Sequence, residues 1–120
     1  MSVFSFSLPI PTPSLNVVNG WHWSKRHKWT QQIQMIVRME ARRLGWDGSG
    51  KAIKRLVTVT RFSAGRLDTD NFIGGCKGLV DALVRAGVLV DDSPDWVTVD
   101  YVQAKSKRDE AGTQVEVVEI

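Results

Sequence analysis

The feature that most restricts the fold of this chain is a stretch, residues 24–44, that contains neither glycine nor proline. Apolar side chains such as Trp29, Ile33 and Val37 recur along it near helical spacing, while the arginines fall mostly between them. This periodicity predicts a long amphipathic helix with a basic face. The three glycines in residues 45–50 then predict a turn that ends the helix.

Four other segments have the sequence pattern of β-strands. Residues 3–8 alternate large apolar side chains with serines and end before three prolines. Residues 55–62 are rich in β-branched side chains, which favour strands. Residues 96–104 and 113–120 are also predicted to be strands, and the polar segment that joins them predicts a long β-hairpin.

A second helix is predicted over residues 71–86. It follows Asp70, a residue type that often caps helices, carries one broad apolar face, and stops before Gly87. A chain of 120 residues suits one hydrophobic core. We therefore expect a single compact α+β domain over residues 1–120, in which two main helices flank a mixed β-sheet.

The cysteine content and the first residues restrict the compartment. The one cysteine, Cys76, cannot form an intramolecular disulfide, and no cysteine and histidine cluster is available for a structural zinc site. The N-terminus lacks the basic and apolar regions of a signal peptide, and no run approaches the length of a membrane span. We expect a cytoplasmic protein with no membrane partner.

Charge is distributed unevenly along the chain. Residues 1–66 hold 11 Lys/Arg against 2 Asp/Glu, a net charge of +9, whereas residues 67–120 hold 5 against 11, a net charge of −6. This division favours a polyanion as the partner of one part and a cation as the partner of the other. The alternative is that both sets are scattered over a solvated surface.

The acidic residues form two pairs around the second predicted helix. If residues 68–70 are extended, Asp68 and Asp70 project to the same side and can share one cation. Asp91 and Asp92 follow a short segment that can return beside them. Carboxylates brought together repel one another unless a hard cation such as Mg²⁺ or Mn²⁺ binds them. The alternative is that these aspartates are helix caps and turn residues.

Three blocks in this region resemble the RusA family of Holliday-junction resolvases, small homodimeric endonucleases encoded largely by phages and prophages. They are "DTDN" at residues 68–71, "CKGLVDALV" at residues 76–84 and "AGVLVDDSPDWV" at residues 86–97. They follow the order of the family's D-x-D-N, K-x-x-x-D-A-L and D-D-S blocks. The resemblance extends to "LPIPTPSLN" at residues 8–16, to "HWSKR" at residues 22–26 and to the overall length.

The resemblance implies a RusA-like fold and metal-dependent hydrolysis of DNA at four-way junctions. The family's catalytic carboxylates correspond to Asp68, Asp70 and Asp92, with Asp91 as a further metal ligand; the metal would be Mg²⁺, for which Mn²⁺ can substitute. The family's essential lysine corresponds to Lys77. In some members it follows the second aspartate by four residues, whereas here it follows by seven, which retains nearly the same helical face. Its alternative role is a surface ion pair with Asp81.

Carboxylates repel DNA, so the cations of the first half are needed to bind it. They would contact phosphates without reading sequence. The predicted DNA-binding residues are Lys25, Arg26, Lys28, Arg38, Arg42, Arg43 and Arg66, with Lys54 and Arg55 as further candidates. Two coordinated cuts across a junction need two active sites, which a C2 homodimer provides.

The tryptophans and histidines near the N-terminus have two possible roles. Trp21, Trp23 and Trp29 either stack on DNA bases or anchor the core, and Trp29 is the one expected to be buried. His22 and His27 are expected to hydrogen-bond to phosphate or backbone rather than to bind metal.

Glycines at positions 74, 75 and 78 weaken the second predicted helix and therefore need a reason. Either another element or subunit approaches closely, or a DNA backbone does.

Two other functions compete with a junction resolvase. One is a broader structure-selective nuclease that acts on flaps or forks, and the other is a non-catalytic DNA-binding protein.

Overall fold

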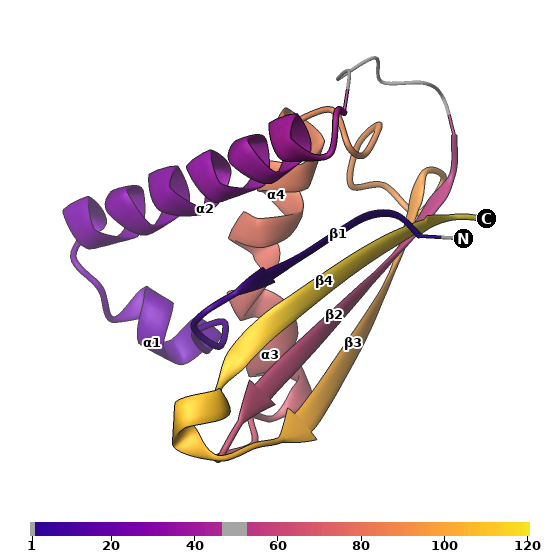
Figure 1. Cartoon of the computed structure of the whole chain (residues 1–120). Helices are drawn as coiled ribbons and strands as arrows, with labels where there is room; N and C mark the ends of the chain where they lie inside the picture. The colour runs from indigo at the N-terminus through magenta and orange to yellow at the C-terminus, as the bar shows by residue number, and fades with distance from the viewer. Residues whose placement is uncertain (1, 47–52) are drawn as a thin grey trace.

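The computed structural model describes residues 2–46 and 53–120, so most of the turn predicted at residues 45–50 lies outside the described residues. The chain folds into a four-stranded sheet with helices packed against it (Figure 1). The strands are β1 (Ser2–Leu8), β2 (Arg55–Ser63), β3 (Val97–Lys105) and β4 (Gly112–Glu119). The helices are α1 (Leu15–Asn19), α2 (Trp23–Arg43), α3 (Thr69–Gly75), α4 (Lys77–Arg85) and the short 3-10 helix η1 (Arg108–Glu110).

The sheet is mixed, in the order β1-β4-β2-β3. β2 pairs parallel with β3, and Arg61 lies beside Gln103 and Ser63 beside Lys105. β4 pairs antiparallel with both β1 and β2. The α+β class and the mixed sheet predicted from the sequence are therefore confirmed.

The predicted hairpin is wrong, although both of its strands exist. β2 lies between β3 and β4, so the link over residues 106–111 crosses the end of β2 instead of forming a tight turn (Figure 1). The alternation of apolar residues records which face of a strand is buried, but it carries no information about which strand lies next to it. Val115 and Val117 are fully buried because β4 is an interior strand of the sheet.

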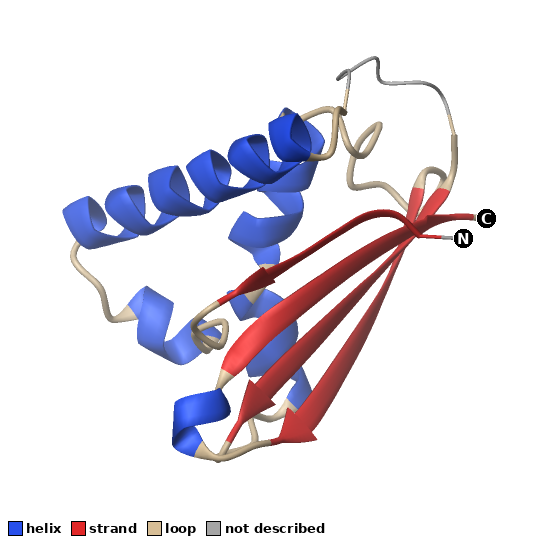
Figure 2. Ribbon diagram, in the orientation of Figure 1, coloured by secondary structure: helices blue, strands red, loops and turns tan. Residues whose placement is uncertain are grey.

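The hydrophobic core lies between the sheet and the helices, which gather against one face of it (Figure 2). β2 contributes Val57 and Val59, and α2 contributes Ile33 and Val37 from the face that its periodicity predicted. The opposite face of the sheet is polar where Thr58 and its neighbours Thr60, Gln114 and Glu116 line a shallow depression. None of the described helices is long and apolar enough to span a membrane.

The second predicted helix is divided in two at Cys76. Its two halves, α3 and α4, continue from one another through Cys76, whose buried thiol lies 3.7 Å from the hydroxyl of Thr12. A side chain at Gly75 would collide with the carbonyl oxygen of Pro13, and one at Gly74 would come within 2.6 Å of Leu15. Two of the three glycines are thus explained by the close approach of residues 13–15 of the same chain.

Candidate functional site

Asp68 and Asp70 lie at the N-terminal end of α3, and both are exposed. Asp68 is the N-cap: its carboxylate accepts hydrogen bonds from the backbone N–H of Asn71 at 2.9 Å and from its side-chain amide at 2.7 Å. Asp70 is in the first helical turn. Asp68 has an extended backbone, but Thr69 and Asp70 already belong to α3, so residues 68–70 do not alternate as in a strand. Asp68 and Asp70 were predicted to share a cation because side chains alternate along a strand, and that reason is therefore wrong.

The charge of Asp68 is stabilised by its own helix. The two hydrogen bonds from Asn71 hold the pKa of the Asp68 carboxyl below its ordinary value, and burial opposes them only weakly. Asp68 is therefore a carboxylate at neutral pH, with lone pairs left for a further ligand. Asp70 also faces solvent at this helix end, where backbone N–H groups favour negative charge.

Asp91 and Asp92 lie beyond the other end of the helical pair. Asp91 closes a turn by accepting a hydrogen bond from the backbone N–H of Ser93. Both line a hollow of about 270 Å³ together with Asp81, Val84 and Arg85. In Figure 1 this segment is next to the C-terminal end of α4, whereas Asp68 and Asp70 are at the far end of α3.

The turn that leads to Asp91 is held by a buried cation. Arg55 is only 2% exposed and donates from Nη1 to the carbonyl oxygen of Val88 at 2.8 Å. Its guanidinium also lies 5.0 Å from the ring of Trp46, which itself donates to the carbonyl oxygen of Gly87 at 3.1 Å. Arg55 is thus a structural residue, and its burial removes it from the surface available to DNA.

The two acidic pairs do not meet on one chain. Within residues 2–46 and 53–120, no three histidine, cysteine or acidic side chains come close enough to hold one metal ion. The prediction that the chain returns Asp91 and Asp92 beside Asp68 and Asp70 is wrong. The physical reason is that α3 and α4 together run from Thr69 to Arg85, about 25 Å at 1.5 Å per residue if straight, and the following turn stays at their far end.

Lys77 is the first residue of α4 and is exposed. Among the described residues it forms no salt bridge, so the alternative ion pair with Asp81 is not present. Cys76, whose backbone is itself helical, is the one residue between α3 and Lys77, so Lys77 lies just beyond the break in the helical pair.

Of the cations predicted to bind DNA, all but the further candidate Arg55, which is buried, are exposed. Six of them are on α2, and at 100° per residue they are spread around its exposed surface rather than forming one stripe: Lys25, Arg26, Lys28, Arg38, Arg42 and Arg43. Arg43 pairs with Glu40 at 2.7 Å. Arg66 lies apart from this group, in the loop between β2 and α3.

The aromatic residues near α2 differ in how far they are buried. Trp29 packs against the core and contacts Trp21, which carries Lys25 over its ring at 4.7 Å. Trp23 is 68% exposed. His22 caps α2 by accepting from the backbone N–H of Ser24, as expected for a residue that hydrogen-bonds to backbone.

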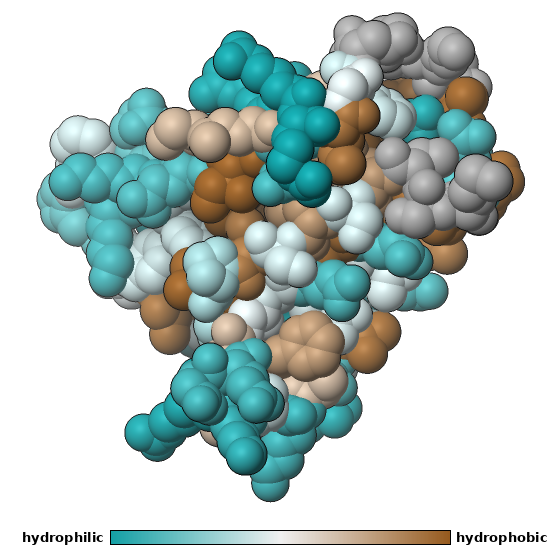
Figure 3. All heavy atoms as spheres, viewed as in Figure 1, coloured by the Kyte–Doolittle hydropathy of each residue, from teal (hydrophilic) through white to brown (hydrophobic). Residues whose placement is uncertain are grey.

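An apolar groove runs between α2 and the end of β1. Its lining includes Ile10, Met35 and Met39, which are 45%, 50% and 62% exposed. Figure 3 shows hydrophobic atoms gathered along this side of α2.

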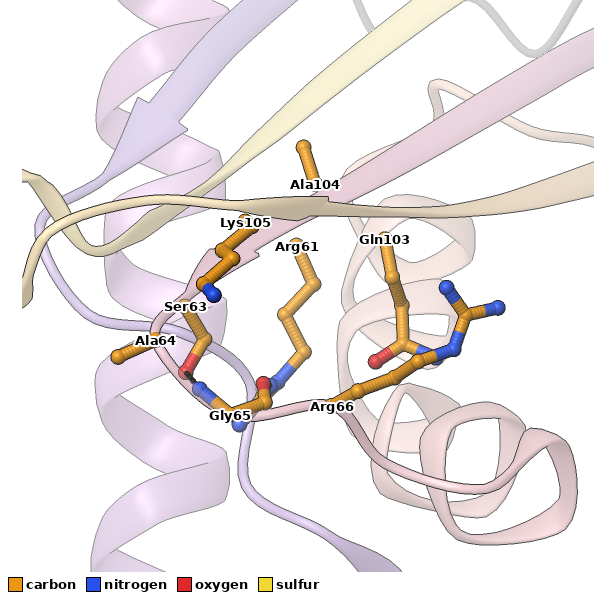
Figure 4. Close-up of a pocket in the computed structure, with 8 residues that line it drawn as sticks. All are labelled: Arg61, Ser63, Ala64, Gly65, Arg66, Gln103, Ala104 and Lys105. Carbon is orange, nitrogen blue, oxygen red and sulfur yellow. Dashed lines mark hydrogen bonds between the residues drawn. The ribbon is translucent and has the colours of Figure 1, made fainter.

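A pocket that the sequence pattern did not predict lies at the carboxyl ends of the parallel strands β2 and β3 (Figure 4). Its volume is about 300 Å³, and its lining includes Arg61, Ser63, Gln103 and Lys105. One signal was present in the sequence. Arg61 continues the alternate positions that Val57 and Val59 occupy, so it points toward the helices rather than to open solvent.

Comparison of the chain with protein-family models finds no match, and neither does comparison with curated proteins.

Proposed function

We propose that this chain is a metal-dependent endonuclease that hydrolyses DNA phosphodiesters at four-way junctions and works as a homodimer. The observation that carries the proposal is the D-x-D-N block, residues 68–71, in order with the two later blocks of the RusA resemblance. Its support from the fold is that both aspartates of this block are exposed at one helix end, beyond the carboxyl ends of two parallel strands. That edge of an α/β sheet commonly binds ligands.

The donor set at this helix end fits Mg²⁺ or Mn²⁺. Mg²⁺ is usually held by one or two carboxylates, and waters and substrate phosphate oxygens complete its ligands. Asp68 and Asp70 are the carboxylates at this helix end, so no third protein ligand is needed. The ion, when bound, would polarise the scissile phosphate and lower the pKa of a bound water. Asp68 holds its charge through Asn71, and Lys77 would offset charge that develops on the phosphate.

The experiment that tests the proposal compares Asp70→Asn with Asp100→Asn, an exposed aspartate on β3. We expect Asp70→Asn to abolish Mg²⁺-dependent cleavage of a four-way junction while junction binding in the presence of Ca²⁺ is retained. Asp100→Asn should cleave like the unaltered protein. Unchanged cleavage by Asp70→Asn would remove this residue from the site.

Asp91 and Asp92 need a separate test, because one chain holds them away from Asp70. Chains carrying Asp70→Asn and chains carrying Asp92→Asn are assayed alone and after mixing. If both are inactive alone and the mixture regains nicking, the second pair acts from the partner subunit. If the mixture stays inactive, the second pair acts within its own chain after a movement of residues 86–96. An active Asp92→Asn variant removes the second pair from the site.

A second candidate is a non-catalytic DNA-binding protein. It is favoured by the hydrogen bonds that Asp68 makes as a helix cap and Asp91 makes in a turn, which explain both residues without a metal. Junction binding with no cleavage under any divalent ion would establish it. A third reaction, cleavage of flaps or forks, is separated by offering equimolar junction, flap and linear substrates.

A further inference from the structure

The pocket at the ends of β2 and β3 has a positive lining with no carboxylate. Arg61, Arg66 and Lys105 contribute cations, and no aspartate or glutamate lines it. None of the three forms a salt bridge with any part of the chain that the structure describes. Arg66 and Lys105 face solvent and Arg61 is buried behind them, and a site of one sign of charge attracts an anion.

The walls of the pocket are fixed by hydrogen bonds. Arg61, 9% exposed, donates from Nε to the carbonyl oxygen of Thr12 at 2.9 Å and from Nη1 to that of Gly65 at 3.2 Å. The hydroxyl of Ser63 accepts from the backbone N–H of Gly65. The loop over residues 64–66 is therefore held against the end of β2.

Gln103 fixes the exit of this loop. Its side-chain amide donates to the carbonyl oxygen of Leu67 at 2.8 Å, and its side-chain oxygen accepts from the Leu67 backbone N–H at 2.9 Å. Leu67 is thereby tied to β3, one residue before Asp68. Figure 4 shows Lys105 and Ser63 on one side of the pocket and Arg66 and Gln103 on the other, with Arg61 between them.

We propose that this pocket binds a backbone phosphate of the DNA strand that is cut, through Arg61, Arg66, Lys105 and the Ser63 hydroxyl. The inference rests on the proposed function and deepens it, because it assigns the substrate contact that positions the strand at Asp68. Leu67 alone separates Arg66 from Asp68, so the Cα atoms of Arg66 and Asp68 are at most about 7 Å apart. The pocket is therefore next to the acidic pair along the chain. A phosphate held here places a neighbouring phosphate of the same strand at Asp68 and Asp70.

The first arm of the test uses inorganic phosphate alone. Phosphate is titrated into the protein, and the ¹⁵N NMR signals of the Arg61 Nε–H and the Gly65 backbone N–H are followed. We expect saturable shifts in the unaltered protein and weaker binding in Lys105→Gln. Sodium chloride at matched ionic strength is the control. Equal responses to both salts would overturn the anion site, whether or not the protein is a nuclease.

The second arm uses a four-way junction in the absence of divalent ions, so a failure of cleavage does not affect it. Arg66→Gln/Lys105→Gln is compared with Lys107→Gln/Arg108→Gln, which removes the same charge from exposed positions just beyond β3. We expect the first pair to reduce the slope of log affinity against log salt by about 1, because both side chains serve one phosphate contact, and the second pair to change it less. Equal reductions of this slope in the two double variants would show that the pocket does not contact DNA.

The two arms together separate the sources of phosphate. Phosphate binding together with the selective loss of salt dependence supports a backbone phosphate of DNA. Phosphate binding with no selective effect on DNA overturns the inference in favour of a free phosphate or nucleotide. If no DNA binds at all, the proposed function fails, and the first arm still reports whether the anion site exists.

Discussion

The side-chain amide of Asn71 donates to the carboxylate of Asp68 at 2.7 Å, and the same side chain accepts from the backbone N–H of Asn16 at 3.1 Å. One residue therefore joins the cap of α3 to α1. Asp68 is both a structural cap and, in the proposed function, a metal ligand. Variants can separate these roles because asparagine caps helices about as well as aspartate, whereas alanine does not.

For Asp68, we expect Asp68→Ala to lower the melting temperature most and Asp68→Asn to lower it less, because asparagine still caps the backbone N–H of Asn71 but lacks the charge. Both should lose Mg²⁺-dependent cleavage, since neither carries the charge that binds the ion. Thermal unfolding followed by circular dichroism, with a junction cleavage assay on the same samples, measures both effects. Full cleavage by Asp68→Asn would restrict this residue to its capping role.

For Asp68, the pH dependence follows from its lowered pKa. The carboxyl is deprotonated more readily in the folded state, so its stabilising contribution is present above the ordinary value of 3.8 and is lost as the pH falls through the lower folded pKa. The melting temperature of the unaltered protein should therefore fall more steeply than that of Asp68→Asn as the pH is lowered through that range. Parallel curves would contradict the assignment.

Gly75 in α3 and Gly78 in α4 differ in the space around them, so one serves as the control for the other. Gly75→Ala should destabilise the protein by about 1–3 kcal/mol, because the added methyl group meets the Pro13 carbonyl oxygen and the backbone has to shift. Gly78→Ala should be neutral or stabilising by up to about 1 kcal/mol, because its position is open and alanine favours helix. Urea unfolding measures both, and a reversed order would contradict the packing of residues 13–15 on α3.

Arg55 is predicted to stabilise the turn before Asp91. Arg55→Met keeps the aliphatic volume but leaves the buried Val88 carbonyl oxygen without its donor, at a cost of about 1–3 kcal/mol. The control is Glu119→Gln: Glu119 is half-exposed and its contact with Arg55 is 3.7 Å, so its loss should change stability by less than about 1 kcal/mol. Chemical denaturation measures both. A larger loss in Glu119→Gln would reverse this assignment.

Cys76 should make the folded state sensitive to alkaline pH. Burial raises the pKa of its thiol from 9.0 to about 11, so the folded state retains a proton that the unfolded state has lost. The stabilisation is complete below pH 9.0 and is lost as the pH rises to about 11, at most about 3 kcal/mol.

The comparison for Cys76 is the free energy of unfolding of the unaltered protein and of Cys76→Ala across this range. Burial raises the pKa of Tyr101, and the charge of Cys76 raises it further, so the difference between the pH slopes of the two proteins reports Cys76 together with its effect on Tyr101. Cys76→Ala should lose less stability between pH 9.0 and 11. Parallel slopes would show that the thiol does not titrate in this way.

Local sequence patterns were enough to predict several elements of this fold. The absence of helix breakers over residues 24–44 predicted α2, because periodic apolar residues and good helix formers act within one turn of each other. Alternation predicted β1, because a strand's buried face repeats every second residue, and β-branched residues predicted β2. The positions of β3 and β4 were predicted as well.

Which elements lie next to one another became visible in the folded chain alone. The insertion of β2 between β3 and β4, the burial of Arg55, and the division of a predicted helix at Cys76 all depend on contacts between residues far apart in the chain. The same holds for the acidic residues: the spacing of Asp68, Asp70, Asp91 and Asp92 is visible in the sequence, but the direction of the chain after α4 places the pairs apart. Packing and long-range hydrogen bonds set that direction, and no local pattern encodes them.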